Sequence, residues 1–233
     1  MQMVPSNDPS NSIKSGIVDS SVEPEPQKQQ DQEIPNLVLV AALLSGAMMV
    51  LAVIFSLFGF CAPQQSLLSF DFNEVVLPAI VWGVGSSIPL ILILLAIFKL
   101  DFGPFQTMKG TIDNLLIPIF KDCTIVQIAI ISILAGISEE MFFRWCLQGG
   151  LSIGWTEILG EGVWPGIIIA GVIFGGCHYI TLTYALFATL MGIYLGCVME
   201  LSGTYLASAM THFIYDFVAL CLIVRLAANR QQP

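Results

Sequence analysis

Long apolar runs without a charged residue constrain this chain more than any other feature. Residues 36–60 and 75–98 contain no Asp, Glu, Lys or Arg, and at 1.5 Å per residue each can cross a hydrocarbon core of about 30 Å as a helix. A third run begins near residue 123, residues 162–199 are uncharged over a length that fits two crossings, and a sixth run covers 204–226. We therefore predict an all-α integral membrane protein, a bundle of about six transmembrane helices.

Composition divides the chain into four expected regions. Residues 1–34 are rich in Ser, Pro, Gln and Asn and hold six of the seventeen acidic residues, so they cannot bury enough apolar surface to fold and should form a disordered cytoplasmic tail. Residues 35–122 hold the first two membrane helices and a loop on the water side, in which the patch "NLLIPIF" is expected along the membrane interface. Residues 123–226 form the membrane core that carries the polar site, and residues 227–233 a short tail. The tail, with six acids and two lysines, contributes −4 to the net charge of −9, and this acidic balance does not indicate a nucleic-acid partner.

The basic residues predict an orientation. Apart from Arg144, every Lys and Arg lies in the first tail, in the loop of residues 99–121 or near the end of the chain, whereas the expected loops 61–74 and 148–161 have none. The positive-inside rule then places both termini in the cytoplasm. Counting helical rises puts Glu139 and His212 nearer the outer face and His178 nearer the inner face, a difference that tilt, a broken helix or a miscounted crossing in residues 101–122 would remove.

A small set of ionisable residues interrupts the apolar runs. Each is unfavourable by roughly 2.5–3.5 kcal/mol at the centre of a membrane helix, so such groups point to a functional site within the membrane. The chain has only two histidines, and both belong to this set. Its members are Glu139, Glu140, Arg144, His178, His212 and Asp216.

The spacing of these residues suggests their roles. Glu140 and Arg144 are i,i+4 on one helix and can form a charge-assisted pair. Glu139 lies about 100° round the helix and lacks that partner, which suits a general base. With the i,i+4 pair His212 and Asp216 and with His178, this carboxylate makes a set that can activate a water molecule and stabilise an oxyanion.

Three motifs carry a resemblance to a known family. "EEMFFR" (139–144), "FGGCH" (174–178) and "HFIYD" (212–216) resemble the ordered motifs EExxxR, FxxxH and HxxxN/D of the CPBP family of intramembrane proteases, which includes the type II CAAX prenyl endopeptidase. The resemblance covers about residues 123–226. It implies a helical bundle with a hydrophilic pocket inside the membrane that cleaves a membrane-delivered peptide or protein.

The resemblance also implies roles for the motif residues. Glu139 would activate the attacking water with His178 beside it, and His212 with Asp216 would stabilise the tetrahedral oxyanion. Glu140 and Arg144 would hold the pocket in shape.

Two chemical questions stay open at this point. Family members often have Asn where this chain has Asp216, and an ionised Asp cannot donate a hydrogen bond, so Asp216 is protonated, orients His212 or serves as a ligand. Glu139, His178 and His212 also suit a catalytic Zn²⁺ with one open position, although no HExxH motif is present. Water is then activated either by the glutamate alone or by the metal.

Three functions are compatible with these residues. An intramembrane endopeptidase explains the assembled base, histidines and oxyanion partner. A proteolytically silent scaffold or chaperone for other membrane proteins is the alternative. A proton-linked transporter is disfavoured because no inverted repeat is present. The sequence indicates neither the substrate nor the oligomeric state.

The six cysteines show no CxxC spacing and mostly fall inside or at the ends of apolar runs. This placement predicts reduced residues that pack in the core.

Overall fold

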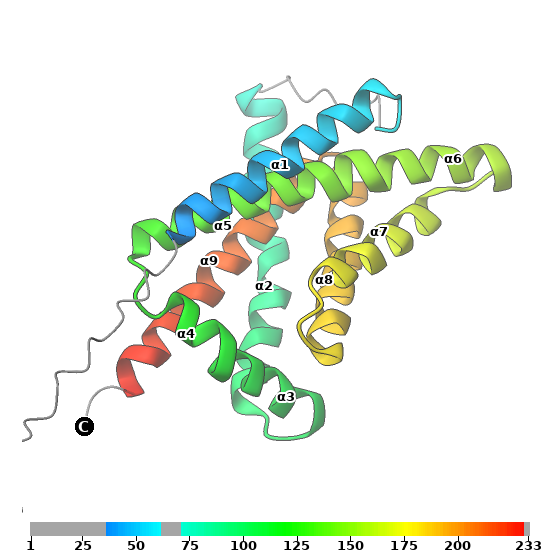
Figure 1. The fold of residues 1–233 in the computed structure, drawn as a ribbon. Coiled ribbons are helices and arrows are strands. Elements are labelled where there is room, and N and C mark those ends of the chain that lie inside the picture. The colour runs from blue at the N-terminus through cyan, green and yellow to red at the C-terminus, as the bar shows by residue number, and fades with distance from the viewer. Residues whose placement is uncertain (1–35, 62–70, 231–233) are drawn as a thin grey trace, which may run out of the picture. The chain divides into compact units, whose positions relative to one another are not determined.

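The computed structural model describes residues 36–61 and 71–230; the expected tail of residues 1–34 lies outside them. The chain forms helices in the order shown in Figure 1. The α-helices are α1 (Leu37–Leu57), α2 (Leu77–Lys99), α3 (Gly103–Thr111), α4 (Ile117–Phe120), α5 (Ile125–Glu140), α6 (Gly149–Leu159), α7 (Val163–Cys177), α8 (Leu182–Ser202) and α9 (Tyr205–Arg230). Three π-helical turns, η1 (Phe72–Val76), η2 (Ile112–Leu116) and η3 (Met141–Gln148), join some of them.

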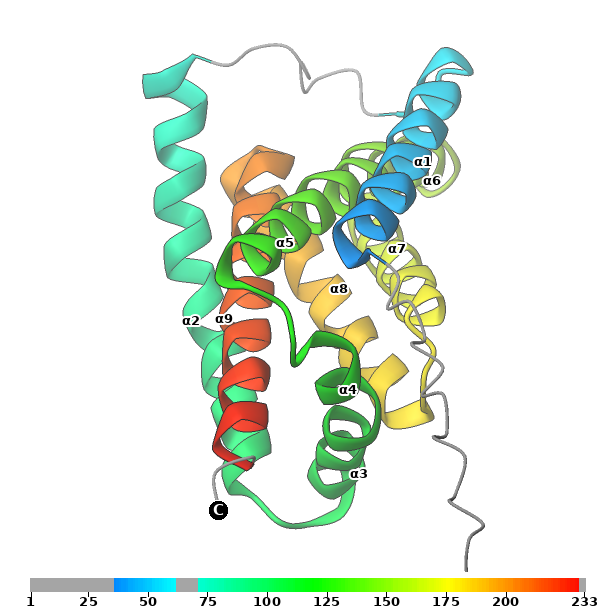
Figure 2. The same ribbon diagram turned by 60° about the vertical axis from the view of Figure 1, so that its left-hand side comes forward.

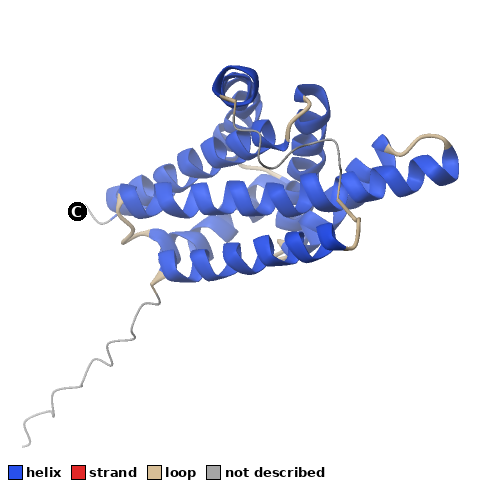
Figure 3. Cartoon of the chain, turned by 90° about the horizontal axis from the view of Figure 1, so that it is seen from above, coloured by secondary structure: helices blue, strands red, loops and turns tan. Residues whose placement is uncertain are grey.

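The predicted all-α membrane fold is confirmed. Five helical stretches are long and apolar enough to cross a membrane, and the described part of the chain contains helices and loops but no strand (Figure 3). The remaining predicted crossing, the fourth along the chain, corresponds to α7, which has only 15 residues. At 1.5 Å per residue α7 is about 22 Å long, shorter than a hydrocarbon core of about 30 Å, so it can end within the membrane.

The expected loop at residues 148–161 is wrong over most of its length. The helix that begins at Ile125 continues through η3 and α6, so that the apolar stretch Ile125–Ile158 is helical over 34 residues. Gly150 does not break this helix; a Cβ there would lie 2.1 Å from the carbonyl oxygen of Phe60, so glycine permits a close contact with the chain after α1. The helix ends at Gly160, whose φ of 77° is the left-handed conformation that glycine adopts easily.

The expected loop at residues 99–122 is also largely helical, as α3, η2 and α4. Ile112 and Ile117 are buried in a cluster with Ile97 of α2 and Ile223 of α9. The "NLLIPIF" patch is therefore partly core: Ile117 packs inward, while other members, such as Ile119, stay exposed. The apolar residues of this patch therefore form contacts within the protein as well as an exposed apolar surface.

A close crossing of α5 and α9 positions the polar residues. Figure 2 shows α5 running obliquely past α9. At the contact, a Cβ added to Gly136 would lie 2.9 Å from the carbonyl oxygen of Ala209 and 3.0 Å from the backbone nitrogen of Phe213. One turn further along α5 come Glu139 and Glu140, which therefore face the part of α9 that carries His212.

Replacing Gly136 by Ala tests this crossing. The new methyl group would meet backbone atoms of α9, which cannot move without separating the two helices, so we expect the free energy of unfolding to fall by about 1–3 kcal/mol. Gly46→Ala on α1 is the matched control because nothing lies within 4 Å of the added Cβ. Thermal unfolding of the detergent-solubilised variants measures the difference. An unchanged melting temperature for Gly136→Ala would contradict the crossing.

Candidate active site

A buried network of charges lies where η3 meets α9. Arg144 Nε donates to Glu140 Oε2 at 2.8 Å, and Nη2 lies 3.5 Å from Oε1 of the same carboxylate. His212 Nδ1 approaches Glu140 Oε1 from α9 at 3.1 Å. Glu140 and Arg144 are fully buried and His212 is 3% exposed. The predicted pair is present, and it also holds a histidine from another helix.

Glu139 faces a different partner. Its Oε2 lies 3.6 Å from His178 Nε2, and this buried oxygen has no hydrogen-bond partner among the described residues. His178 Nδ1 lies 2.8 Å from the carbonyl oxygen of Phe174 and must carry a proton to bond with it, so in the neutral ring Nε2 is a bare acceptor. Two acceptors then face each other, an arrangement that a water molecule satisfies by donating to both.

This contact removes the depth difference expected from counting helical rises. His178 follows the end of the short helix α7, and α5 runs obliquely to α9 (Figure 2). Glu139 and His178 therefore meet, although they were expected nearer opposite faces of the membrane.

His212 also contacts Asp216, one turn further along α9. Its Nε2 lies 3.4 Å from Asp216 Oδ2. Both ring nitrogens of His212 therefore face carboxylate oxygens, a position that suits the imidazolium, which donates from both nitrogens. Of the three roles considered for Asp216, this geometry favours the orientation of His212.

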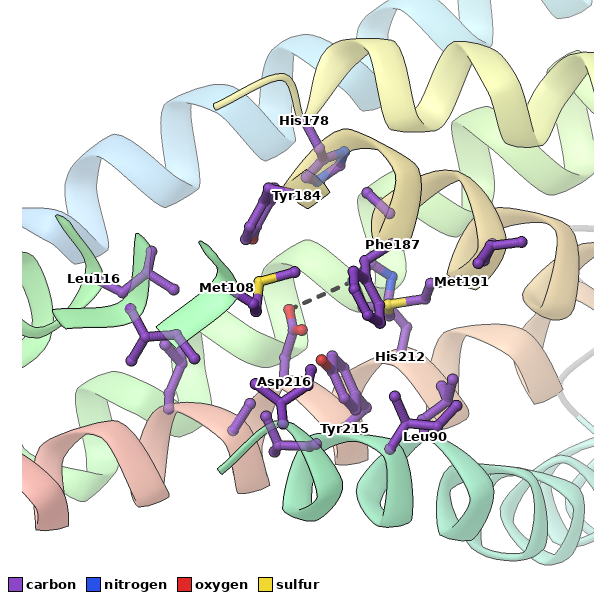
Figure 4. A pocket seen from close by; sticks show the side chains of 18 of the residues that line it. Leu90, Met108, Leu116, His178, Tyr184, Phe187, Met191, His212, Tyr215 and Asp216 are labelled. Carbon is purple, nitrogen blue, oxygen red and sulfur yellow. Dashed lines mark ion pairs between the residues drawn. The ribbon is translucent and has the colours of Figure 1, made fainter. Parts of the chain in front are cut away.

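The polar residues border an apolar cavity of about 550 Å³. Glu139, His178, His212 and Asp216 line it, whereas Glu140 and Arg144 lie outside its lining. Figure 4 shows His212 and Asp216 at the cavity with their ion pair dashed, among apolar side chains such as Leu90 and Met191. The structure thus separates the predicted residues into four that can reach a ligand and two that support them from behind.

Phe174 contacts several members of the site, although only its place in the FxxxH pattern marks it in the sequence. Its ring stacks on His178 with centroids 4.3 Å apart and meets His212 edge-on at 6.0 Å. The Arg144 guanidinium lies 5.1 Å from its centroid, within the range of a cation–π contact. Phe174 therefore connects the buried charge network to both histidines.

Two tyrosines also line the cavity, Tyr184 of α8 and Tyr215 of α9 (Figure 4). Tyr215 adjoins Asp216, a position that in the sequence favours ordinary packing. Tyr184 lies outside all three motifs, and no sequence signal marks it. Both bring hydroxyl groups to a mainly apolar wall.

The zinc ligand set Glu139, His178 and His212 does not converge in this structure. In residues 36–61 and 71–230, no three His, Cys, Asp or Glu side chains are grouped closely enough to hold a metal ion. Glu139 Oε2 lies 3.6 Å from His178 Nε2, and His212 lies between Glu140 and Asp216. Zinc remains a prediction.

The two adjacent glutamates should respond differently to removal of their charge. Glu140→Gln leaves the buried guanidinium of Arg144 without its carboxylate, so we expect the free energy of unfolding to fall by about 3–5 kcal/mol. Glu139→Gln leaves that network intact and should unfold close to the wild-type temperature. Thermal unfolding in detergent compares them, and equal destabilisation of the two variants would contradict the division between support and cavity.

The comparison with known proteins agrees with the three motifs. Residues 121–218 match the family "Type II CAAX prenyl endopeptidase Rce1-like". Neither a curated protein nor a solved structure matches the chain. The matched segment contains every residue of the candidate site, from Glu139 to Asp216. The resemblance to the CAAX proteases of the CPBP family is thus confirmed over residues 121–218.

Proposed function

We propose that the chain is an intramembrane endopeptidase that hydrolyses peptide bonds of membrane-associated proteins or peptides. The observation that carries the proposal is the carboxylate of Glu139, whose Oε2 faces His178 Nε2 at 3.6 Å beside a cavity of about 550 Å³. An unpaired carboxylate is unfavourable in such a place, and a structural role offers nothing that offsets this. A role in binding and activating water would explain why the carboxylate is kept there.

In the proposed reaction, one water molecule lies between Glu139 and His178. Its hydrogens point to the carboxylate and to the bare Nε2 of His178, which leaves an oxygen lone pair directed into the cavity. Glu139 takes one proton as the water oxygen attacks the substrate carbonyl carbon, and later gives that proton to the departing amine nitrogen. The backbone carbonyl of Phe174 accepts a hydrogen bond from His178 Nδ1 and so fixes the Nδ1–H tautomer that this step requires.

His212 stabilises the oxyanion of the tetrahedral intermediate. Between Glu140 and Asp216 it is held as an imidazolium, and its Nε2–H lies at the cavity wall, where the developing negative charge can share this donor with Asp216. A fixed donor in a site without bulk water stabilises such a charge more strongly than the same donor would in water. Asp216 then acts through His212 and needs no proton of its own.

The cavity suits a substrate that arrives from the membrane. Its wall is formed mainly by apolar side chains of α2, α8 and α9, such as Leu90, Phe187 and Leu220. An extended, apolar peptide segment would lose little solvation on entering it. By the positive-inside rule, both termini and the loop with α3 and α4 face the cytoplasm.

The first experiment compares membrane and secreted peptides by mass spectrometry in cells that carry wild-type protein, Glu139→Gln or no protein. Gln keeps the size of the side chain but removes the base, so cleavage should fall at least about a hundredfold, and the same uncleaved precursor should accumulate in the Gln and null cells. That precursor identifies the substrate.

Glu157→Gln is the matched control, because Glu157 is an exposed glutamate on α6. Cells with this variant should match the wild type. If Glu139→Gln cells also match the wild type while null cells differ, proteolysis is wrong and the scaffold or chaperone is the better interpretation.

Two substitutions of Asp216 separate orientation from charge. Asn can still accept a hydrogen bond from His212, whereas Leu cannot, so we expect Asp216→Leu to reduce kcat by about a hundredfold or more and Asp216→Asn to retain much of the activity. Cleavage of the identified precursor by purified protein measures both. Equal loss in the two variants would contradict a role for Asp216 as a hydrogen-bond acceptor.

A further inference from the structure

Two cysteines meet where the chain leaves α1. Cys61 Sγ lies 2.6 Å from Sγ of Cys146 in η3, although 85 positions separate the two residues in the sequence. Cys61 is 7% exposed and Cys146 is fully buried. Their spacing predicted separate, reduced packing residues, but the fold brings these two thiols together outside the active site.

A hydrogen-bonded turn at the end of α1 places Cys61 beside Cys146. Gly59 has φ 73°, its N–H donates to the Ser56 carbonyl at 2.9 Å, and the N–H of Phe60 donates to the Phe55 carbonyl at 3.0 Å. This is the Schellman pattern that ends a helix and reverses the chain. The rings of Phe55 and Phe60 pack edge to face with centroids 6.0 Å apart, which supplies the apolar contact typical of that motif.

The surroundings hold both sulfur atoms in one place. Each thiol lies near the carbonyl oxygen of Ala52, at 3.7 Å for Cys61 and 3.9 Å for Cys146. Both cysteines belong to a buried cluster with Trp145 and Met199. The backbone of Phe60 is also pressed against Gly150, one turn beyond Cys146. Only a small approach then separates the sulfurs from the bond length of about 2.05 Å.

The charge pattern places this pair on the oxidising side of the membrane. Cys61 begins the segment 61–74, which contains no Lys or Arg, and Cys146 lies against Cys61. The positive-inside rule assigns such segments to the non-cytoplasmic face. Disulfides form and persist in the compartments found there.

We propose that Cys61 and Cys146 form a disulfide bond that ties the end of α1 to η3. The oxidant is a protein or small molecule that itself carries a disulfide: its bond to one leaving sulfur breaks as Cys61 attacks it, and Cys146 then displaces the other sulfur. Two protons and two electrons pass from the cysteines to the oxidant, which leaves as two thiols. Exchange occurs before the turn after α1 packs, and burial then shields the bond from reductants.

The bond would brace the helix that carries the catalytic glutamate. Cys146 lies between one and two helical turns beyond Glu140, two residues after the buried Arg144. Fixing this stretch to α1 restrains η3, which also contacts α9.

The test counts thiols in protein from cells treated with N-ethylmaleimide at harvest, so that no bond forms afterwards. After denaturation, a second maleimide reagent of different mass labels the thiols exposed by reduction. We expect reduction to release two thiols per chain, and an unreduced digest to contain the peptides of Cys61 and Cys146 joined. If reduction releases no thiol in the wild type, the proposal is overturned.

Two substitutions assign the bond. Cys61→Ala should abolish the thiols released by reduction, whereas Cys177→Ala, at an exposed cysteine, should leave both. Release of two thiols from Cys61→Ala, or joined peptides that contain another cysteine in place of this pair, would overturn the assignment. The digest of wild-type protein decides the question even if Cys61→Ala does not accumulate, and neither result depends on protease activity.

Discussion

The buried carboxylate of Glu140 is the constraint on which the rest of the site depends. An ion removed from water loses several kcal/mol of solvation, and only well-placed partners offset that loss. Arg144 supplies one partner from the same helix at 2.8 Å, and His212 supplies the other from α9 at 3.1 Å. Because these partners come from η3 and from α9, the carboxylate of Glu140 ties the two helices together in this register.

That register gives two adjacent glutamates opposite surroundings. Successive residues of a helix point about 100° apart, so fixing Glu140 against α9 turns Glu139 toward the cavity. There it meets His178, which the end of α7 and the ring of Phe174 hold in place. The geometry of the candidate site is thus a consequence of the support network, while close helix contacts such as that at Gly136 make the network possible.

Contacts within one helix could be predicted from the sequence, whereas contacts between helices mostly could not. The pairs Glu140–Arg144 and His212–Asp216 follow from i,i+4 spacing, and the apolar runs indicate the crossings. The His212–Glu140 contact joins residues 72 positions apart, and spacing alone cannot reveal it. Tyr184 enters the cavity for the same kind of reason: α8 packs beside α9, but no pattern in its own sequence distinguishes it from core tyrosines.

The predicted helix boundaries were wrong where the local composition suggests a loop but packing stabilises a helix. Glycines and polar residues near 148–161 resemble a loop, yet Gly150 serves a close contact and the backbone remains helical to Leu159. In residues 103–120, lysines and prolines suggested a water-side loop, but two prolines lie in first helical turns, where the missing N–H is not needed. Burial of Ile112 and Ile117 then stabilises helices that are too short to persist alone.

The Asp at the end of the third motif changes the charge balance of the proposed oxyanion site. Glu140 and Arg144 offset each other, so an imidazolium at His212 depends on the remaining carboxylates of the site, Glu139 and Asp216. Of these two, Asp216 makes the direct contact, with its Oδ2 3.4 Å from His212 Nε2. The resting site can then keep His212 charged in an apolar wall, and the full positive charge is already in place when the substrate carbonyl begins to gain negative charge. An ionised Asp in this position therefore favours the same step that an Asn would assist by direct donation.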